Sequence, residues 1–352
     1  MRYTRVYIDA LGYELPPVVV TSRELEHRLE RLYSALHLSE GRLEALTGIS
    51  ERRWWDPGYP LSEGAAASAR HALQASNVRP GDLDVLIYAG VCREQFEPAT
   101  ACRVAAAIGV NPGAAVHDVS NACLGVLTGM VDVANRIELG QIRAGMVVSC
   151  ETAREINDIM IDRMLQSGTM EAFRLSLATL TGGSGAVAVL LTDGSFSSQK
   201  RRRLLGGATQ TAPQFHALCR WGLETLEALP LPHFAQLQSM STDSAAVLKY
   251  GVELGARTWS AFLRRVGWMK EHIDKVICHQ VGSGHRDQIL ETLGIASERE
   301  FCTYPYLGNI GTVSLPLTAA LAEDRGFLEA GDRVAFLGIG IGLNCLMLGV
   351  EW

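Results

Sequence analysis

The stretch Leu83-Asp-Val-Leu-Ile-Tyr-Ala-Gly-Val91 has a counterpart in Ile273-Asp-Lys-Val-Ile-Cys-His-Gln-Val281, in the same register. Asp84 and Asp274 are the second residues of the two runs and are 190 residues apart (274 − 84). Each run is short and apolar, as a buried strand is, and each follows an amphipathic segment typical of a helix. A helix that leads into a buried strand at both places predicts an internally repeated α/β fold.

A second pair of apolar runs strengthens this prediction. Residues 144–150 and 333–339 follow the first pair at a similar offset. Two pairs in the same order predict two duplicated halves, residues 1–198 and 199–352. The first half also contains a Met-rich, helical stretch at 154–181 that has no counterpart in the second half. This insertion is either a packing element or a cap over an apolar pocket.

Composition restricts the class of protein. The chain has 352 residues, 47% of them hydrophobic, and a formal net charge of −6, which disfavours nucleic acid as the main partner. Its apolar runs are too short to span a bilayer, and its start has no signal-peptide core. Eight cysteines without a CxxC pair predict reduced thiols and no metal site. We therefore expect a cytoplasmic protein without a transmembrane segment.

The first candidate for chemistry is Cys123, in Val116-His-Asp-Val-Ser-Asn-Ala-Cys-Leu-Gly125. A short strand ends there, small residues turn the chain, and an amphipathic helix begins. The N–H groups at a helix N-terminus stabilise a thiolate, so we expect a lowered pKa for Cys123. A cysteine before a helix is more often structural, and partners are needed to favour a nucleophile.

Two such partners lie in the second half. His279 ends the repeated strand and precedes a glycine-rich turn, at the place where a doubled α/β fold has its active site. Asn309 lies in Tyr306-Leu-Gly-Asn-Ile-Gly-Thr312, where it could also serve only the turn. Together with Cys123 they suit thioester chemistry, because one group attacks while two donate hydrogen bonds to the carbonyl oxygen.

Two glycine-rich stretches resemble motifs of other enzyme classes, but neither stretch matches its motif completely. Phe336-Leu-Gly-Ile-Gly-Ile-Gly-Leu-Asn-Cys345 lacks the third glycine of a dinucleotide motif, since position 343 is leucine. The backbone N–H groups near Gly340 and Gly342 are instead suited to approach a substrate oxygen. Gly182-Gly-Ser-Gly-Ala186 misses the GxSxG pattern of serine hydrolases by one residue.

The four motifs in this order resemble the thiolase superfamily: Asn-Ala-Cys123-Leu-Gly, His279-Gln-Val, Gly308-Asn309-Ile-Gly and the glycine-rich last strand. More narrowly, the chain resembles the β-ketoacyl-ACP synthase III branch and the OleA-type enzymes that condense long-chain acyl-CoA. This resemblance implies a five-layered αβαβα fold of two duplicated halves, in a homodimer. It further implies that Cys123 is acylated, that His279 and Asn309 bind the second substrate, and that backbone N–H groups of Cys123 and of Gly340–Gly342 form the acyl oxyanion hole.

Glu97 separates the two branches. It stands directly before Pro98, as in OleA-like proteins, where the equivalent residue enters the active site from the partner subunit. A synthase III obtains its carbanion by decarboxylating malonyl-ACP, whereas condensing two plain acyl thioesters requires removal of an α-proton. The resemblance therefore implies that Glu97 is the catalytic base. Glu97 could also be an ordinary solvated carboxylate.

The reaction expected from the resemblance is a Claisen condensation without decarboxylation. One fatty acyl-CoA acylates Cys123, and a second supplies the carbanion, which gives a β-ketoacyl product and, after hydrolysis, a β-keto acid for olefin, ketone or β-lactone synthesis. No cofactor is expected besides the coenzyme A of the substrate. Three alternatives stay open: decarboxylative condensation with a malonyl thioester, acyl transfer to oxygen or nitrogen, and a role as one subunit of a heteromeric condensing complex.

Three further residues are predicted to bind substrate. Met160 and Phe173 lie in the apolar stretches 159–165 and 173–180, which are suited to line alkyl channels. Arg203 ends the run Lys200-Arg-Arg-Arg203, which is either a solvated loop or a contact for the phosphates of coenzyme A or for an acidic carrier protein.

Overall fold

The computed structural model describes residues 1–197, 202–225 and 236–352. Its main sheet has nine strands. In spatial order these are β11 (Lys275–Cys278), β12 (Arg333–Gly340), β13 (Asn344–Glu351), β8 (Arg203–Thr211), β1 (Tyr7–Glu14), β7 (Gly185–Thr192), β6 (Ala144–Glu151), β4 (Val85–Ala89) and β5 (Ala115–Val119).

The strand order repeats on the two sides of the β1–β8 junction. In the first half β4 is parallel to β6, which is antiparallel to β7, which is antiparallel to β1. In the second half β11, β12, β13 and β8 follow the same sequence of directions. The prediction of two duplicated α/β halves is therefore confirmed. The proposed boundary at residues 198 and 199 lies outside the described residues and stays a prediction.

Asp84 and Asp274, the aspartates that identify the repeat in the sequence, make the same kind of hydrogen bond in the structure. The Asp84 carboxylate accepts a hydrogen bond from the backbone N–H of Arg143 at 2.8 Å, and the Asp274 carboxylate accepts one from Arg333 at 2.8 Å. Each aspartate thus joins the start of one strand to the start of its parallel neighbour. This shared contact explains why both sequence runs begin in the same way.

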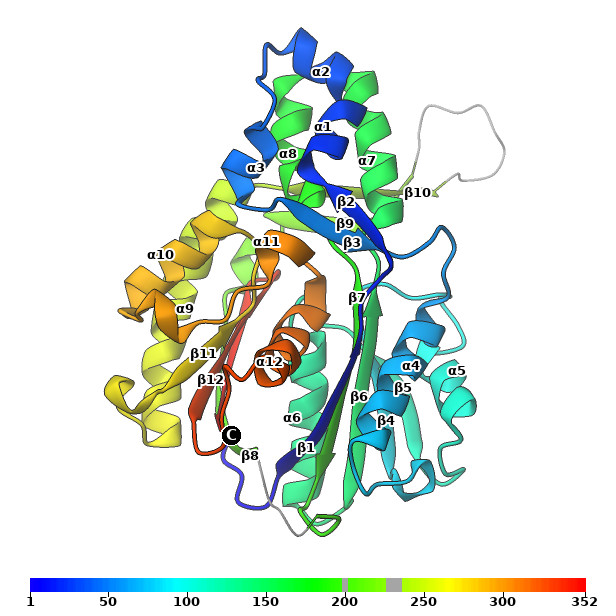
Figure 1. Cartoon of the computed structure of the whole chain (residues 1–352), viewed down its shortest axis with the longest axis vertical. Helices are drawn as coiled ribbons and strands as arrows, with labels where there is room; N and C mark the ends of the chain where they lie inside the picture. Colours follow the sequence, from blue (N-terminus) through cyan, green and yellow to red (C-terminus); the bar gives the residue numbers. More distant parts are fainter. Residues whose placement is uncertain (198–201, 226–235) are drawn as a thin grey trace.

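Five layers result from how the helices cover the two halves of the sheet (Figure 1). Helices α6 (Gly125–Glu138) and α12 (Ser314–Asp324) lie in the middle, within an apolar cluster that includes residues of both halves. Helices α4 (Leu61–Gln74) and α5 (Thr100–Ile108) cover the outer face of the first half, and α9 (Ser244–Val266) and α10 (Ser283–Leu293) cover that of the second. Strands β6 and β7 are buried at every position, as expected of apolar runs with helices on both faces.

The insertion at 154–181 is helical, as predicted, and forms α7 (Arg154–Ser167) and α8 (Met170–Leu180). It packs with α1 (Ser22–Arg28), α2 (Glu30–Ala35) and α3 (Arg42–Thr47) at one end of the molecule (Figure 1). The remaining elements are β2 (Val18–Thr21), β3 (Glu51–Trp54), β9 (Cys219–Thr225), β10 (Gln236–Thr242) and α11 (Tyr304–Leu307). Within the described ranges, we find no helix with the length and apolar character needed to cross a membrane.

Candidate active site

Cys123 lies in the tight turn between β5 and α6. Ala122, directly before it, has a φ of 44°, in the left-handed region that non-glycine residues seldom adopt. The backbone N–H of Leu124 donates to the carbonyl of Asn121 at 2.9 Å, and that of Gly125 donates to the carbonyl of Ala122 at 3.2 Å. These two bonds close the turn and hold Cys123 at the N-terminus of α6.

Two adjoining cavities meet at Cys123. The first, of about 410 Å³, is also lined by Glu151, Asn309 and Gly311. The second, of about 280 Å³, is lined by His279, Asn309 and Gly340 together with apolar side chains. Apolar residues of the second cavity come from several elements: Leu46, Leu177, Met240, Val247, Leu248, Ile339, Ile341 and Leu343. The structure therefore brings three sequence candidates, Cys123, His279 and Asn309, to one place.

His279 directly follows β11, and its side chain is only 4% exposed. Its backbone N–H donates to the carbonyl of Leu337 at 3.0 Å, which fixes the end of the strand. Its Nδ1 atom is buried and has no hydrogen-bond partner among the described residues. Burial, with a contribution from the neighbouring His285, lowers the pKa of His279 to about 3. The ring is therefore neutral at neutral pH, when it can donate one N–H or accept a proton.

Asn309 is held by its backbone and by one side-chain atom. Its N–H donates to the carbonyl of Thr181 at 2.9 Å, and its carbonyl accepts from Gly183 at 2.9 Å. The side-chain oxygen accepts from the N–H of Gly311 at 3.1 Å. Because the oxygen is engaged in this way, the amide NH₂ is the group that Asn309 can offer to a substrate carbonyl.

The glycine-rich end of β12 lies against the cysteine turn. A Cβ atom added at Gly340 would be 3.1 Å from Cγ of Leu124 and 3.5 Å from the backbone nitrogen of Cys123. Gly342 has a φ of 140°, which favours glycine. This close approach suits an oxyanion site made by backbone N–H groups, and that role stays a prediction for Gly340 and Gly342.

One expectation about Cys123 is wrong. The sequence predicts that the helix N-terminus lowers the pKa of Cys123, but burial, with a contribution from the nearby carboxylate of Glu151, raises it to about 12. Cys123 keeps some accessible surface because it lines the cavities, yet it lies away from bulk water. The thiol is therefore protonated at neutral pH, and acylation requires a group that takes its proton. The neutral His279 borders the same cavity.

Glu97 lies in the exposed loop between β4 and α5 and lines neither of the two cavities. The preceding side chain, Phe96, is 89% exposed. Only Val91, at the start of this loop, borders the 410 Å³ cavity. A single chain thus does not bring Glu97 to Cys123.

The three predicted substrate-binding residues also lie outside the two cavities. Arg203, the first residue of β8, pairs with Glu351 at 2.7 Å and lines neither cavity. Lys200 and Arg201 lie outside the described residues. Phe173 contacts Tyr33 edge-on, with ring centroids 5.8 Å apart, and Met160 is buried on α7. The residues by which α7 and α8 border the cavities are Ile156, Leu177, Ala178 and Thr179.

Among the residues that border these cavities, the sequence interpretation missed Glu151, Cys219 and His285. His285 follows His279 by six residues on α10, and a second histidine on the next helix was the available signal. Glu151 ends β6, in the strand that the repeat had already identified. Cys219 comes from β9, which no motif indicated.

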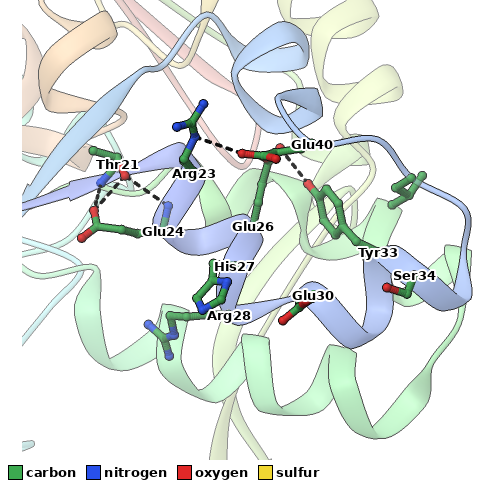
Figure 2. Close-up of a pocket in the computed structure, with 11 residues that line it drawn as sticks. Thr21, Arg23, Glu24, Glu26, His27, Arg28, Glu30, Tyr33, Ser34 and Glu40 are labelled. Carbon is green, nitrogen blue, oxygen red and sulfur yellow. Dashed lines mark hydrogen bonds and ion pairs between the residues drawn. The ribbon is translucent and has the colours of Figure 1, made fainter.

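A further pocket, of about 750 Å³, lies beside α1 and α2 and shares no lining residue with the two cavities (Figure 2). Its buried carboxylate, Glu26, accepts hydrogen bonds from the hydroxyl of Tyr33 and from the backbone N–H groups of Gly41 and Leu43. Arg23 pairs with Glu40 at 3.0 Å. These contacts hold the helices and the following turn together, so the burial of the Glu26 carboxylate has a structural explanation.

The chain is similar to known proteins in sequence and in fold. Residues 263–352 match the family model described as 3-oxoacyl-[acyl-carrier-protein (ACP)] synthase III C terminal. An acyl-CoA:acyl-CoA alkyltransferase of Shewanella oneidensis is 56% identical over 100% of both chains. Another, from Xanthomonas campestris, is 33% identical over 100% of both.

Solved structures of Xanthomonas campestris OleA have the same fold. The cerulenin-bound structure superposes with a TM-score of 0.92 at 33% identity and covers 100% of this chain and 98% of that chain. A serine variant with bound lauric acid and lauroyl-CoA superposes with a TM-score of 0.91 over 99% of this chain and 100% of that one. Because these relatives align with the chain over its full length, the chain belongs to the OleA-type acyl-CoA:acyl-CoA alkyltransferases of the thiolase superfamily.

Proposed function

We propose that this protein catalyses a Claisen condensation, without decarboxylation, between two long-chain acyl-CoA molecules through an acyl-Cys123 intermediate. The observation that carries the proposal is the convergence of Cys123, His279 and Asn309 on two adjoining cavities. Relatives named acyl-CoA:acyl-CoA alkyltransferases, and an OleA structure with bound lauroyl-CoA, support the substrate class. No cofactor is required besides the coenzyme A that the substrates carry.

The first half-reaction acylates Cys123. The thiol loses its proton to the neutral ring of His279 as sulfur attacks the thioester carbonyl, and the proton then leaves with the thiol of coenzyme A. Backbone N–H groups of Cys123 and of the Gly340–Gly342 stretch stabilise the oxyanion. The apolar side chains of the 280 Å³ cavity are suited to hold an alkyl chain.

The second half-reaction forms the carbon–carbon bond. The carbonyl of a second acyl-CoA accepts hydrogen bonds from the Asn309 amide and the His279 ring, which makes the α-proton more acidic. Glu97 removes that proton, and the α-carbon attacks the acyl-Cys123 carbonyl. The carbon–sulfur bond breaks, the Cys123 thiol is reprotonated, and a β-ketoacyl-CoA is released; water then cleaves it to a β-keto acid.

Glu97 requires a second copy of the chain. In one chain it lies on an exposed loop beside Phe96, a large apolar side chain that is 89% exposed. Exposed aromatic residues are typical of interface cores. We therefore assign the functional unit as a homodimer in which residues 93–99 of each subunit reach the cavities of the other.

A second candidate function is decarboxylative condensation with a malonyl thioester, as in the synthase III branch. The match of residues 263–352 to a synthase III family model favours it. Acyl transfer to oxygen or nitrogen and a role in a heteromeric condensing complex are the remaining alternatives. A β-keto acid would be the substrate of a reductase or a decarboxylase, which gives a route to β-lactones, olefins or ketones.

Mixing two inactive variants tests the shared site. Cys123→Ala lacks the nucleophile and Glu97→Gln lacks the base, so each should be inactive alone. Random reassortment of the two should restore about a quarter of the wild-type activity, because half of the dimers are mixed and each has one complete site. Glu298→Gln, at an exposed carboxylate elsewhere, is the control and should retain full activity. An active Glu97→Gln enzyme, or no recovery on mixing, contradicts the assignment.

A further inference from the structure

Glu151 is a buried carboxylate that the mechanism above leaves unused. It ends β6, its side chain is 4% exposed, and no described cation forms an ion pair with it. Burying a carboxylate without a counter-ion lowers the stability of the folded protein, so its presence beside a nucleophile indicates a functional role. Two sets of contacts made by the Glu151 side chain point to that role.

The first set holds the start of the loop that carries Glu97. One carboxylate oxygen of Glu151 accepts the N–H of Val91 at 2.9 Å, and the other accepts the N–H of Cys92 at 3.1 Å. The hydroxyl of Tyr88 shares its one proton between the carbonyls of Cys92 and Cys150, at 2.9 and 2.7 Å, and so reinforces the same connection. Bonds to a charged acceptor are about twice as strong as neutral ones, which makes the carboxylate a firm anchor.

The second set faces the nucleophile and the Asn309 turn. Glu151 lines the 410 Å³ cavity together with Cys123 and Asn309. A Cβ atom at Gly311 would be 3.4 Å from Cγ of Glu151, so the backbone that donates to Asn309 lies directly against this side chain. One carboxylate therefore borders the nucleophile, the Asn309 turn and the beginning of the base loop.

We propose that Glu151 is a positioning residue that holds the Glu97 loop and the Asn309 turn around Cys123, and whose negative charge disfavours a free Cys123 thiolate. Cys123 then loses its proton only as it attacks a bound thioester. This proposal rests on the proposed function, in which Glu97 and Asn309 serve carbon–carbon bond formation and Cys123 serves acylation. Burial raises the pKa of Glu151 above its ordinary value, whereas the hydrogen bonds from the N–H groups of Val91 and Cys92 favour its charged form. The raised pKa of Cys123, to which the charge of Glu151 contributes, agrees with the geometry.

Two variants separate the charge from the anchoring. Glu151→Gln removes the charge but keeps one acceptor for the loop N–H groups. Glu151→Asp keeps the charge but withdraws the carboxylate by one methylene. Three quantities are measured for each variant: the rate at which iodoacetamide alkylates Cys123 between pH 7 and 9, the rate of acylation by myristoyl-CoA, and the rate of condensation. Alkylation is followed by peptide mass spectrometry, with Cys123→Ala as the background.

Glu151→Gln is expected to raise the alkylation rate of Cys123 about tenfold at pH 8, because removing a nearby negative charge favours the thiolate. Both variants should slow condensation at least tenfold while acylation falls by less than threefold. Glu300→Gln is the matched control: it changes another buried carboxylate, paired with Arg286 at 2.6 Å and outside both cavities, and should leave Cys123 alkylation unchanged.

Two results would overturn the proposal. If Cys123 is alkylated at the same rate in Glu151→Gln as in the wild type, the charge of Glu151 does not disfavour the Cys123 thiolate. Acylation and condensation reduced equally in both variants, with a lowered melting temperature, indicate a merely structural residue. If the wild-type enzyme makes no product from acyl-CoA alone, the proposed function fails, whereas the alkylation comparison still tests Glu151 by itself.

Discussion

The side-chain oxygen of Asn309 accepts a hydrogen bond from the backbone N–H of Gly311 at 3.1 Å. This contact fixes which end of the amide is available in the cavity that also contains Cys123 and His279. Asn309 therefore acts as a donor, and the chemistry assigned to it depends on its NH₂ group.

Asn309→Asp replaces this donor by an acceptor of nearly the same shape. We expect condensation to slow about a hundredfold to a thousandfold, the usual effect of losing one oxyanion donor. Acylation of Cys123, which does not use Asn309, should fall by less than tenfold. Intact-mass measurement of the acyl-enzyme and product analysis distinguish the two steps.

Asn111 supplies a matched control for that substitution. Its side-chain oxygen accepts the N–H of Gly113 at 2.8 Å, the same local contact, but on the surface. Asn111→Asp should leave both steps within twofold of the wild type. Equal effects at the two positions would mean that Asn309 serves only its turn.

Gly340→Ala tests the close approach of β12 to the cysteine turn. The added Cβ atom would lie 3.1 Å from Cγ of Leu124, which must move by a few tenths of an ångström, and in van der Waals contact with the backbone nitrogen of Cys123 at 3.5 Å. We expect acylation of Cys123 to slow at least tenfold. Gly81→Ala, where an added Cβ meets nothing within 4 Å, is the control. Unchanged acylation in Gly340→Ala would exclude an oxyanion site that depends on this approach.

The two buried histidines predict how stability depends on pH. Burial lowers the pKa of His279 to about 3 and that of His285 to about 4. Between these values and the ordinary histidine pKa near 6.5, the unfolded chain binds more protons than the folded one, so stability falls as the pH is lowered. Each histidine should contribute about 1–2 kcal/mol to the loss of unfolding free energy between pH 7 and pH 5.

His285→Asn isolates one of these contributions. In urea titrations at pH 7 and pH 5, the variant should lose about 1–2 kcal/mol less unfolding free energy than the wild type. His37 is exposed with a φ of 53°, which asparagine tolerates, and His37→Asn should behave like the wild type. The same loss in His285→Asn and the wild type would contradict the prediction.

The sequence predicted those parts of the fold and site that depend on local patterns. Asp84 and Asp274 each bond to the start of the neighbouring strand, so the repeat left a visible pattern. Cys123, His279 and Asn309 lie at the ends of elements whose order a repeated α/β fold determines. Their convergence followed from the topology together with the resemblance to a known superfamily.

Other features depend on contacts between distant segments and were not predictable. The pKa of Cys123 was expected to be low because the sequence reveals the helix that follows, but not the cavity or the carboxylate of Glu151. Arg203 was considered for substrate binding, yet it pairs with Glu351, 148 positions further along the chain. Glu151 itself looked like an ordinary residue at a strand end, because its partners Val91 and Cys92 are about 60 residues away.

Product analysis tests the central proposal most directly. The purified enzyme is given myristoyl-CoA alone, then myristoyl-CoA with malonyl-CoA, and the products are identified by mass spectrometry. Cys123→Ala should give no product in either case. We predict a long β-keto acid, or the ketone left after its decarboxylation, from myristoyl-CoA alone. Product formed only when malonyl-CoA is present would contradict condensation of two plain acyl-CoA molecules and would assign the enzyme to the decarboxylative branch.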